Sequence, residues 1–285
     1  MSAHTTTHGA RSTSTDTGAG KPARWLRWTA RIGFVAEGLV YVLIGGFALV
    51  VAFEPGGRPQ GSAGALAQLG DAPLGKAMLT VLAAGLAAFV LWQGARALFD
   101  PEHRRDRWTV KRIAMRLGFL LNAALHAVLV GDAVWHVLTA GGDGNHGQTQ
   151  ALWTQRIMQL PLGRWAVALT GIGIVLFGLF QFYRAATGVA NKGLDLSHTR
   201  LRIPLLTLGV IGCAACGVVF ALIGVLLVHA AWRYDASQAK GVAGALSTLH
   251  TQPYGPWVLG AVAVGLIAYG LFQIARARFA SFLRL

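Results

Sequence analysis

One spaced pattern occurs three times in this chain and constrains its fold more than any other feature. Each copy has a Pro-x-Gly tripeptide, a glycine ten residues later, a glutamine eight residues after that and an arginine three residues further on. The copies begin at Pro73, Pro161 and Pro253. A fixed period of this kind defines the structural unit of a repeat protein. The sequence therefore predicts three copies of one supersecondary unit.

The composition places these units in a membrane. Hydrophobic residues make up 54% of the 285 residues and charged residues only 13%, whereas charged residues are roughly 25% of an ordinary soluble domain. Six segments reach the length of about 20 mainly apolar residues that spans a bilayer. They lie near 31–53, 74–99, 112–138, 161–187, 203–232 and 256–279. These runs are too long, and lack the alternation, for barrel strands.

The predicted fold is an all-α integral membrane protein of six transmembrane helices in three two-helix repeats. The repeats cover 24–99, 100–187 and 188–285, after a tail (1–23) whose Ser, Thr, Gly and Ala predict disorder. Two spans per repeat give every repeat the same orientation. Repeats in parallel orientation are related by an axis along the membrane normal, so we expect a pseudo-threefold arrangement.

The positive charge is distributed unevenly between the two sides of the predicted spans. Of the 25 Lys and Arg residues, 19 lie in the N-terminal stretch up to Arg31, the 96–116 region, the 184–202 region and the C-terminal end. The positive-inside rule makes that side, with both termini, cytoplasmic. The net charge of +14 is therefore interpreted as membrane topology, with no nucleic-acid partner. The basic cluster Arg104-Arg105-Asp106-Arg107, with Lys111 and Arg112, is expected to meet anionic lipid headgroups.

Short amphipathic stretches precede each Pro-x-Gly on the external side, around 64–66, 150–152 and 244–246. Each is predicted to be a short interfacial helix. A transmembrane helix should follow with its proline in the first turn, where proline is well tolerated.

At 100° per residue, the glycines, glutamine and arginine of each copy lie on one stripe of the second helix of the repeat. Small residues allow close helix contact, and buried amides find partners across helices. The predicted helix-packing glycines are Gly75, Gly85, Gly163, Gly173, Gly255 and Gly265. The first helices carry matching stripes, namely Gly33-Glu37-Tyr41-Gly45, Gly118-Asn122-His126 and Gly212-Cys216-Phe220-Gly224. The candidate polar cluster comprises Glu37, Gln93, Arg96, Asn122, His126, Gln181, Arg184, Gln273 and Arg276.

The repeated signature, together with the segment from Arg31 to Tyr41, resembles a bacterial membrane family known as domain of unknown function 1206. The resemblance covers about residues 24–279. It implies three tandem two-helix units in a bacterial cytoplasmic (inner) membrane. It brings no activity, substrate or cofactor.

Glu37 is the one glutamate well inside a predicted span, and an ionisable group at that depth suggests a function. Its expected partner is Arg96 or Arg276. Two interpretations stand side by side: a structural pair that ties helices together, and a role in transport or proton handling.

Other reactive side chains give weaker signals. Histidines that face inward could bind haem or a metal; the candidates are His126 beside Asn122, His136 beside Asp132, and His229. Cys213 and Cys216 have the spacing of a redox pair, but inside an apolar span small packing residues are the simpler interpretation. The glycine-rich segment 141–147 lacks a complete calcium-loop pattern. No catalytic residue, metal or cofactor is therefore predicted.

Three functions remain open from the sequence. The leading one is a non-enzymatic membrane protein that acts in assembly, partner binding or membrane organisation. The second is a small-solute or ion conduit along the pseudo-threefold axis. The third is a membrane redox or haem protein.

Overall fold

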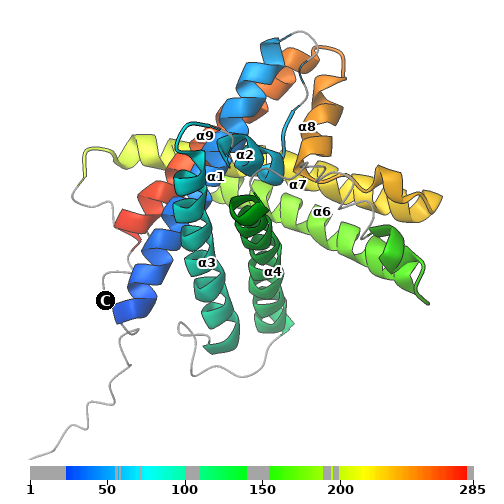
Figure 1. The fold of residues 1–285 in the computed structure, drawn as a ribbon, viewed down its shortest axis with the longest axis horizontal. Coiled ribbons are helices and arrows are strands. Elements are labelled where there is room, and N and C mark those ends of the chain that lie inside the picture. The colour runs from blue at the N-terminus through cyan, green and yellow to red at the C-terminus, as the bar shows by residue number, and fades with distance from the viewer. Residues whose placement is uncertain are drawn as a thin grey trace, which may run out of the picture.

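The computed structural model describes residues 24–54, 57, 59–70, 72–99, 110–139, 154–188, 194 and 199–280. The predicted tail, the basic residues 104–107 and the glycine-rich segment 141–147 fall outside these ranges. The long helices are α1 (Arg24–Phe53), α3 (Gly75–Phe99), α4 (Val110–Thr139), α6 (Gly163–Thr187), α7 (Arg202–Arg233) and α9 (Gly255–Phe279) (Figure 1). Two short helices, α2 (Ser62–Gly70) and α8 (Val242–His250), and the 3₁₀ turn η2 (Ala236–Gln238) connect them. Within the described ranges the strand-like pairing is one isolated bridge, between Leu194 and Ala280.

Six of these helices contain stretches long and apolar enough to cross a membrane. The stretches are Arg27–Phe53, Gly75–Ala95, Gly118–Leu138, Gly163–Thr187, Arg202–Arg233 and Gly255–Phe279. The prediction of an all-helical protein with six membrane-spanning helices is thus confirmed. Helices α2 and α8 occupy two of the predicted interfacial positions, and each buries a small apolar face that includes Ala65 and Leu66 in α2 and Ala245 and Leu246 in α8.

The same helix–helix contact links each repeat to the preceding one, with repeat 1 following repeat 3. The first helix of each repeat (α1, α4, α7) packs on the second helix of the preceding repeat, so that α1 lies against α9, α4 against α3 and α7 against α6. Contacts within a repeat join α1 to α3 and α7 to α9. Between the described parts of α4 and α6 no extensive contact forms. The helices therefore follow an open series α4–α3–α1–α9–α7–α6 (Figure 1), and the closed pseudo-threefold ring that the sequence predicted is not confirmed.

Glycines explain why α1 and α9 approach so closely. A Cβ added to Gly38 would lie 2.5 Å from the carbonyl oxygen of Gly270, and one added to Gly45 would lie 2.7 Å from that of Ala263. Both helices thus place small residues seven apart, a spacing of two turns that returns to one helix face. Small residues at such a face let backbones touch.

The α6–α7 contact repeats this arrangement, because Cβ atoms added to Gly171 and Gly178 would lie 2.9 Å from the carbonyl oxygens of Gly224 and Gly217, respectively. At the α3–α4 contact the equivalent residues are Ala83, Val90, Ala123 and Val130. Their side chains hold the helices further apart, which accounts for a less extensive contact.

Each Pro-x-Gly forms a tight turn just before a transmembrane helix. The glycine N–H donates to the carbonyl three residues back, at 2.7 Å for Gly75, 2.9 Å for Gly163 and 2.8 Å for Gly255. The middle residue has a positive φ in every copy, 60° at Leu74, 65° at Leu162 and 61° at Tyr254. Proline followed by a residue at positive φ is typical of a type II turn. The prediction of a proline inside the first helical turn is wrong, because the helix begins at the glycine.

The glycines of these turns have a different role from the one predicted. A Cβ added to Gly75, Gly163 or Gly255 would collide with a backbone carbonyl oxygen of the preceding segment, that of Leu69, Ile157 or His250. They allow the chain to reverse direction at the membrane surface instead of packing one spanning helix on another. Of the other predicted packing glycines, Gly85 would meet the Ala36 methyl at 2.6 Å and Gly265 that of Ala215, whereas Gly173 has nothing within 4 Å.

This turn predicts opposite effects for two neighbouring substitutions. Gly163→Ala should lower the unfolding temperature, because the added methyl meets the Ile157 carbonyl. Leu162→Gly should leave it unchanged or raise it, since Leu162 is 77% exposed and glycine adopts a positive φ without steric cost. Thermal unfolding of both variants in detergent tests this expectation. A stable Gly163→Ala variant would contradict it.

Candidate functional site

Polar side chains gather in the interior where α1, α6, α7 and α9 meet, and we refer to them as the polar cluster. Its members are Glu37 and Tyr41 of α1, Gln181 and Arg184 of α6, Cys213 and Cys216 of α7, and Tyr269, Gln273 and Arg276 of α9. The three most buried hydrogen-bonding side chains are Glu37, Gln181 and Gln273, which are 4%, 1% and 2% exposed. All three repeats contribute to this cluster.

Glu37 is held by a glutamine that is itself held by an arginine. The Gln273 side-chain amide donates to the Glu37 carboxylate, while the Arg276 guanidinium donates to the Gln273 side-chain oxygen at 3.0 Å. Arg276 and Arg184 are cations whose charges act on the carboxylate. Arg276 also lies 4.7 Å from the centre of the Phe34 ring, a favourable cation–π position. The one carboxylate is thereby joined to two other repeats.

The same glutamine–arginine arrangement occurs on α6. Arg184 donates to the side-chain oxygen of Gln181 at 2.6 Å, again across three residues of a helix. In the third repeat the position of Glu37 is occupied by Cys216. In the remaining copy Gln93 is 6% exposed, and the side chain of Arg96 lies outside the part of the chain that the structure describes. Arg96, one of the two predicted partners of Glu37, therefore stays a prediction.

One ring pair recurs at all three contacts between repeats. Tyr41 faces Tyr269 with ring centroids 4.7 Å apart, His126 faces Phe89 at 4.8 Å and Phe220 faces Phe177 at 5.0 Å. In each pair one ring follows the Glu37-equivalent position by four residues and the other precedes the repeated glutamine by four. The Tyr41–Tyr269 and Phe177–Phe220 pairs are edge-on and the Phe89–His126 pair is tilted, and ring contacts at such distances are favourable. The three contacts are therefore copies of one interface.

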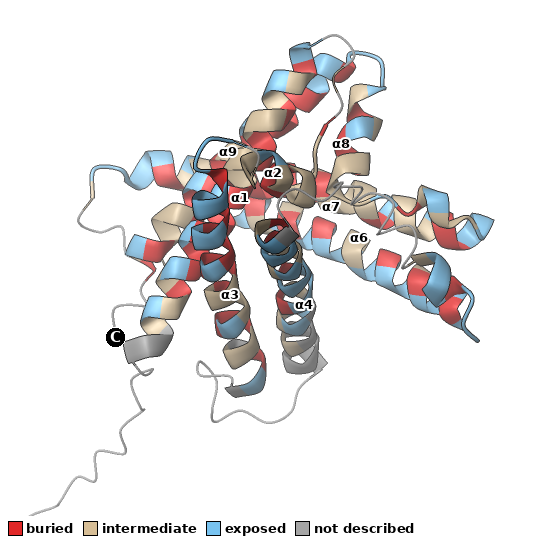
Figure 2. Cartoon of the chain, in the orientation of Figure 1, coloured by how far each residue is buried: buried red, intermediate tan, exposed pale blue. Residues whose placement is uncertain are grey.

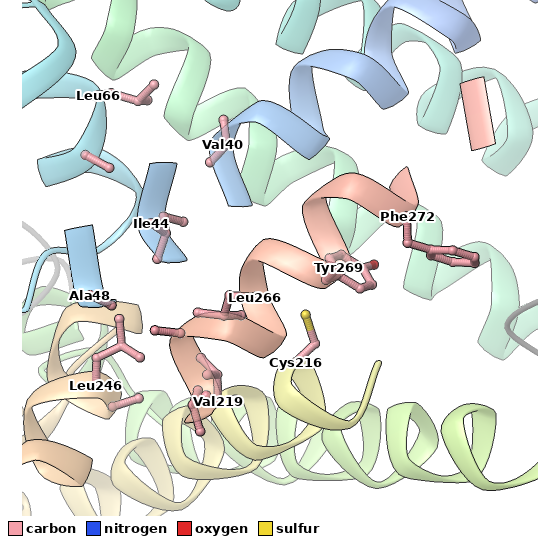
Figure 3. Close-up of a cluster of buried hydrophobic side chains, with 14 of the residues drawn as sticks. Val40, Ile44, Ala48, Leu66, Cys216, Val219, Leu246, Leu266, Tyr269 and Phe272 are labelled. Atoms are coloured by element: carbon pink, nitrogen blue, oxygen red, sulfur yellow. The ribbon is translucent and has the colours of Figure 1, made fainter. Parts of the chain in front are cut away.

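The two cysteines lie in the apolar core beside the polar cluster. Cys213 and Cys216 are both fully buried among apolar residues of α1, α7 and α9. Figure 3 shows Cys216 pointing from α7 towards Tyr269 on α9. Both thiols are free. These apolar surroundings favour the interpretation of Cys213 and Cys216 as small packing residues.

The histidines do not form a metal centre in the described residues, where no group of three or more His, Cys, Asp or Glu is placed to hold an ion. His126 has its Nδ1 at 2.9 Å from the Asn122 carbonyl oxygen. A carbonyl only accepts, so Nδ1 carries the proton and the ring donates back to the preceding turn of its own helix. His136 is buried and His229 is exposed, so the structure does not bring the predicted histidines into one site.

Two features of the polar cluster escaped the sequence analysis. The charge of Arg184, in the second repeat, acts on Glu37 in the first, and spacing along one helix does not reveal such an interaction. The aromatic residue four positions before each glutamine is Phe89, Phe177 or Tyr269. Aligning the three copies would have found this signal.

The sequence pattern of the family described as Domain of Unknown Function (DUF1206) matches residues 32–100, 117–188 and 211–280. The chain belongs to the DUF1206 family. Each match covers one two-helix repeat, so Glu37 lies in the first, Gln181 and Arg184 in the second, and Cys216, Gln273 and Arg276 in the third. Three DUF1206 units in one chain thus build a single shared cluster.

A relative of this DUF1206 protein is "Uncharacterized protein YxxB" of Bacillus subtilis (strain 168). The two are 31% identical over 255 residues, which are 88% of this chain and 90% of the relative. The similarity therefore spans nearly the whole of both proteins. No solved structure matches the chain.

Proposed function

We propose that this DUF1206 protein is a non-enzymatic component of a bacterial cytoplasmic membrane that acts by assembling with another membrane protein. The proposal rests on the interactions that hold the Glu37 carboxylate. Its carboxylate accepts from Gln273 and is under the charge of Arg184 and Arg276. A buried carboxylate that accepts a hydrogen bond and lies in the field of two cations is costly to disturb. A polar centre of this kind favours a structural role, as a scaffold that assembles with another protein.

The packing around Glu37 supports the same proposal. The next residue, Gly38, contacts the α9 backbone at Gly270, and one turn along α1 the Tyr41 and Tyr269 rings touch. A conduit needs open space lined by polar groups, whereas here backbones and rings meet. The interior thus favours a packed scaffold over a lined pathway.

A conduit for ions or small solutes is the second candidate. One observation favours it: a carboxylate lies deep inside a spanning helix, the usual mark of an ion or proton pathway. Glu37 would then be the group that exchanges its partner during transport. Ion and proton flux in liposomes, measured with the wild-type chain and with Glu37→Gln, separates this candidate from the first.

We expect the purified full-length protein in liposomes to carry no ion or proton flux and to show no visible absorption band. In native membranes, chemical cross-linking should instead place it in a complex of fixed stoichiometry with another membrane protein. Glu54→Gln, a change at an exposed residue, serves as the control and should leave the cross-linked complex unchanged. Flux that Glu37→Gln abolishes without unfolding would refute the assembly proposal.

The proposed topology has both termini in the cytoplasm and makes a separate prediction. It rests on the 19 of 25 basic residues that lie on that side. A membrane-impermeant label should not reach a cysteine at position 191 in intact cells, but should reach one at position 144. With the native cysteines replaced by alanine, labelling at position 105 from outside would overturn the topology and the proposed contact with anionic lipids.

A further inference from the structure

Helix α6 exposes a face that its counterparts bury. Phe177 is 41% exposed, whereas the equivalent Phe89 and Tyr269 are 2% and 6% exposed. Phe180 is 51% exposed, and its equivalents Trp92 and Phe272 are 3% and 0% exposed. Gly173 has nothing within 4 Å, although Gly85 and Gly265 touch alanine methyls. We define the α6 face as Gly173, Phe177 and Phe180.

Helix α4 shows the complementary difference. Leu125 is 48% exposed, whereas the equivalent Val40 and Val219 are 4% and 3% exposed. Gly118 has nothing within 4 Å of an added Cβ, but one on the equivalent Gly33 would lie 2.6 Å from the Cα of Phe89. We define the α4 face as Gly118 and Leu125. Figure 2 shows α4 with much of its surface exposed.

Lipid contact alone does not explain these faces. The outer row of the second helices is exposed in all three copies, since Leu91, Leu179 and Leu271 are 61%, 53% and 44% exposed. The α4 and α6 faces differ, because their positions are buried in repeats 1 and 3 and exposed in repeat 2. In the two other repeats each face is covered by the partner helix of the same repeat.

We propose that α4 and α6 of one chain dock on each other through these faces and so complete the third copy of the contact seen within repeats 1 and 3. Phe177 then packs on Gly118 as Phe89 packs on Gly33 and Tyr269 on Gly212. This α4–α6 contact, which we call the seam, joins the two ends of the helix series. It also covers the helix that carries Gln181 and Arg184.

Site-specific photo-cross-linking in native membranes tests the seam. p-Benzoylphenylalanine at position 177 or 180 should link to a peptide from α4 (Val110–Thr139) in the monomer band. The matched control at position 179 lies on the same helix but in the lipid-facing row. The cross-link to α4 should be absent from that position. Mixing isotope-labelled and unlabelled chains distinguishes links within a chain from links between chains.

Each outcome decides the question. α4 peptides linked within one chain from positions 177 and 180 support the seam, and the two positions guard against a variant that fails to fold. Links between labelled and unlabelled chains would overturn it in favour of a contact between copies. Links to lipid alone, equal at positions 177, 179 and 180, would show that both faces lie in the bilayer.

Discussion

Replacing Glu37 with glutamine is expected to lower the free energy of unfolding by about 3–5 kcal/mol, the usual cost of leaving a buried charge interaction without one of its charges. The substitution keeps the shape of the side chain, and its amide oxygen still accepts from Gln273. The loss is one of charge, since Arg276 and Arg184 remain beside a neutral group. Unfolding in detergent, followed by circular dichroism, measures the change.

The double variant Glu37→Gln/Arg276→Gln should recover much of that stability, because neutralising both members of a buried pair is often tolerated. Glu54→Gln makes the same chemical change at an exposed site on the first loop and should have little effect. The structural interpretation of Glu37 fails if Glu37→Gln is as stable as the wild type. It also fails if neither Arg276→Gln nor Arg184→Gln rescues it.

Gly45→Leu is expected to have a comparably large effect through packing. A Cβ at this position would lie 2.7 Å from the Ala263 carbonyl oxygen and 2.9 Å from the Ile267 nitrogen. Overpacking usually costs about 1–3 kcal/mol when side chains can move aside, and here the obstacle is backbone. Helices α1 and α9 must therefore separate, which should abolish most of the folded yield.

The adjacent glycine provides the control. Gly46 has nothing within 4 Å of an added Cβ, so Gly46→Leu should fold as well as the wild type. Folded yield is measured as the monodisperse fraction on size-exclusion chromatography. Equal yields for the two variants would mean that α1 and α9 do not pack through this glycine face.

The six spans and the repeat could be predicted because both depend only on short stretches of sequence. Hydropathy over about 20 residues fixes a span, and the spacing from Pro73 to Arg96 recurs unchanged from Pro161 and Pro253. In the structure a Cβ added to Gly85 or Gly265, both on the predicted stripes, would meet an alanine methyl of a neighbouring helix. Family membership followed from the same residues and is confirmed by the three matched segments.

What the sequence could not supply is the choice of neighbour. The stripe on the second helix of a repeat is equally compatible with either adjacent first helix, so the pairing of Glu37 with Gln273 had to come from the structure. The turns were missed for another reason. Leucine and tyrosine rarely adopt a positive φ, and Leu74, Leu162 and Tyr254 do so only because proline and glycine flank them in a reverse turn.

The cyclic contacts bear on how such a chain could arise. If the three repeats were separate molecules, the first helix of each would bind the second helix of the preceding one, which is the head-to-tail interface of a ring-forming homotrimer. In such a trimer any substitution would appear three times around the axis, and three glutamates would repel one another at its centre. Fusion into one chain lifts that restriction. A single carboxylate at position 37 can then coexist with asparagine at 122 and cysteine at 216, and one negative charge serves two arginines from different units.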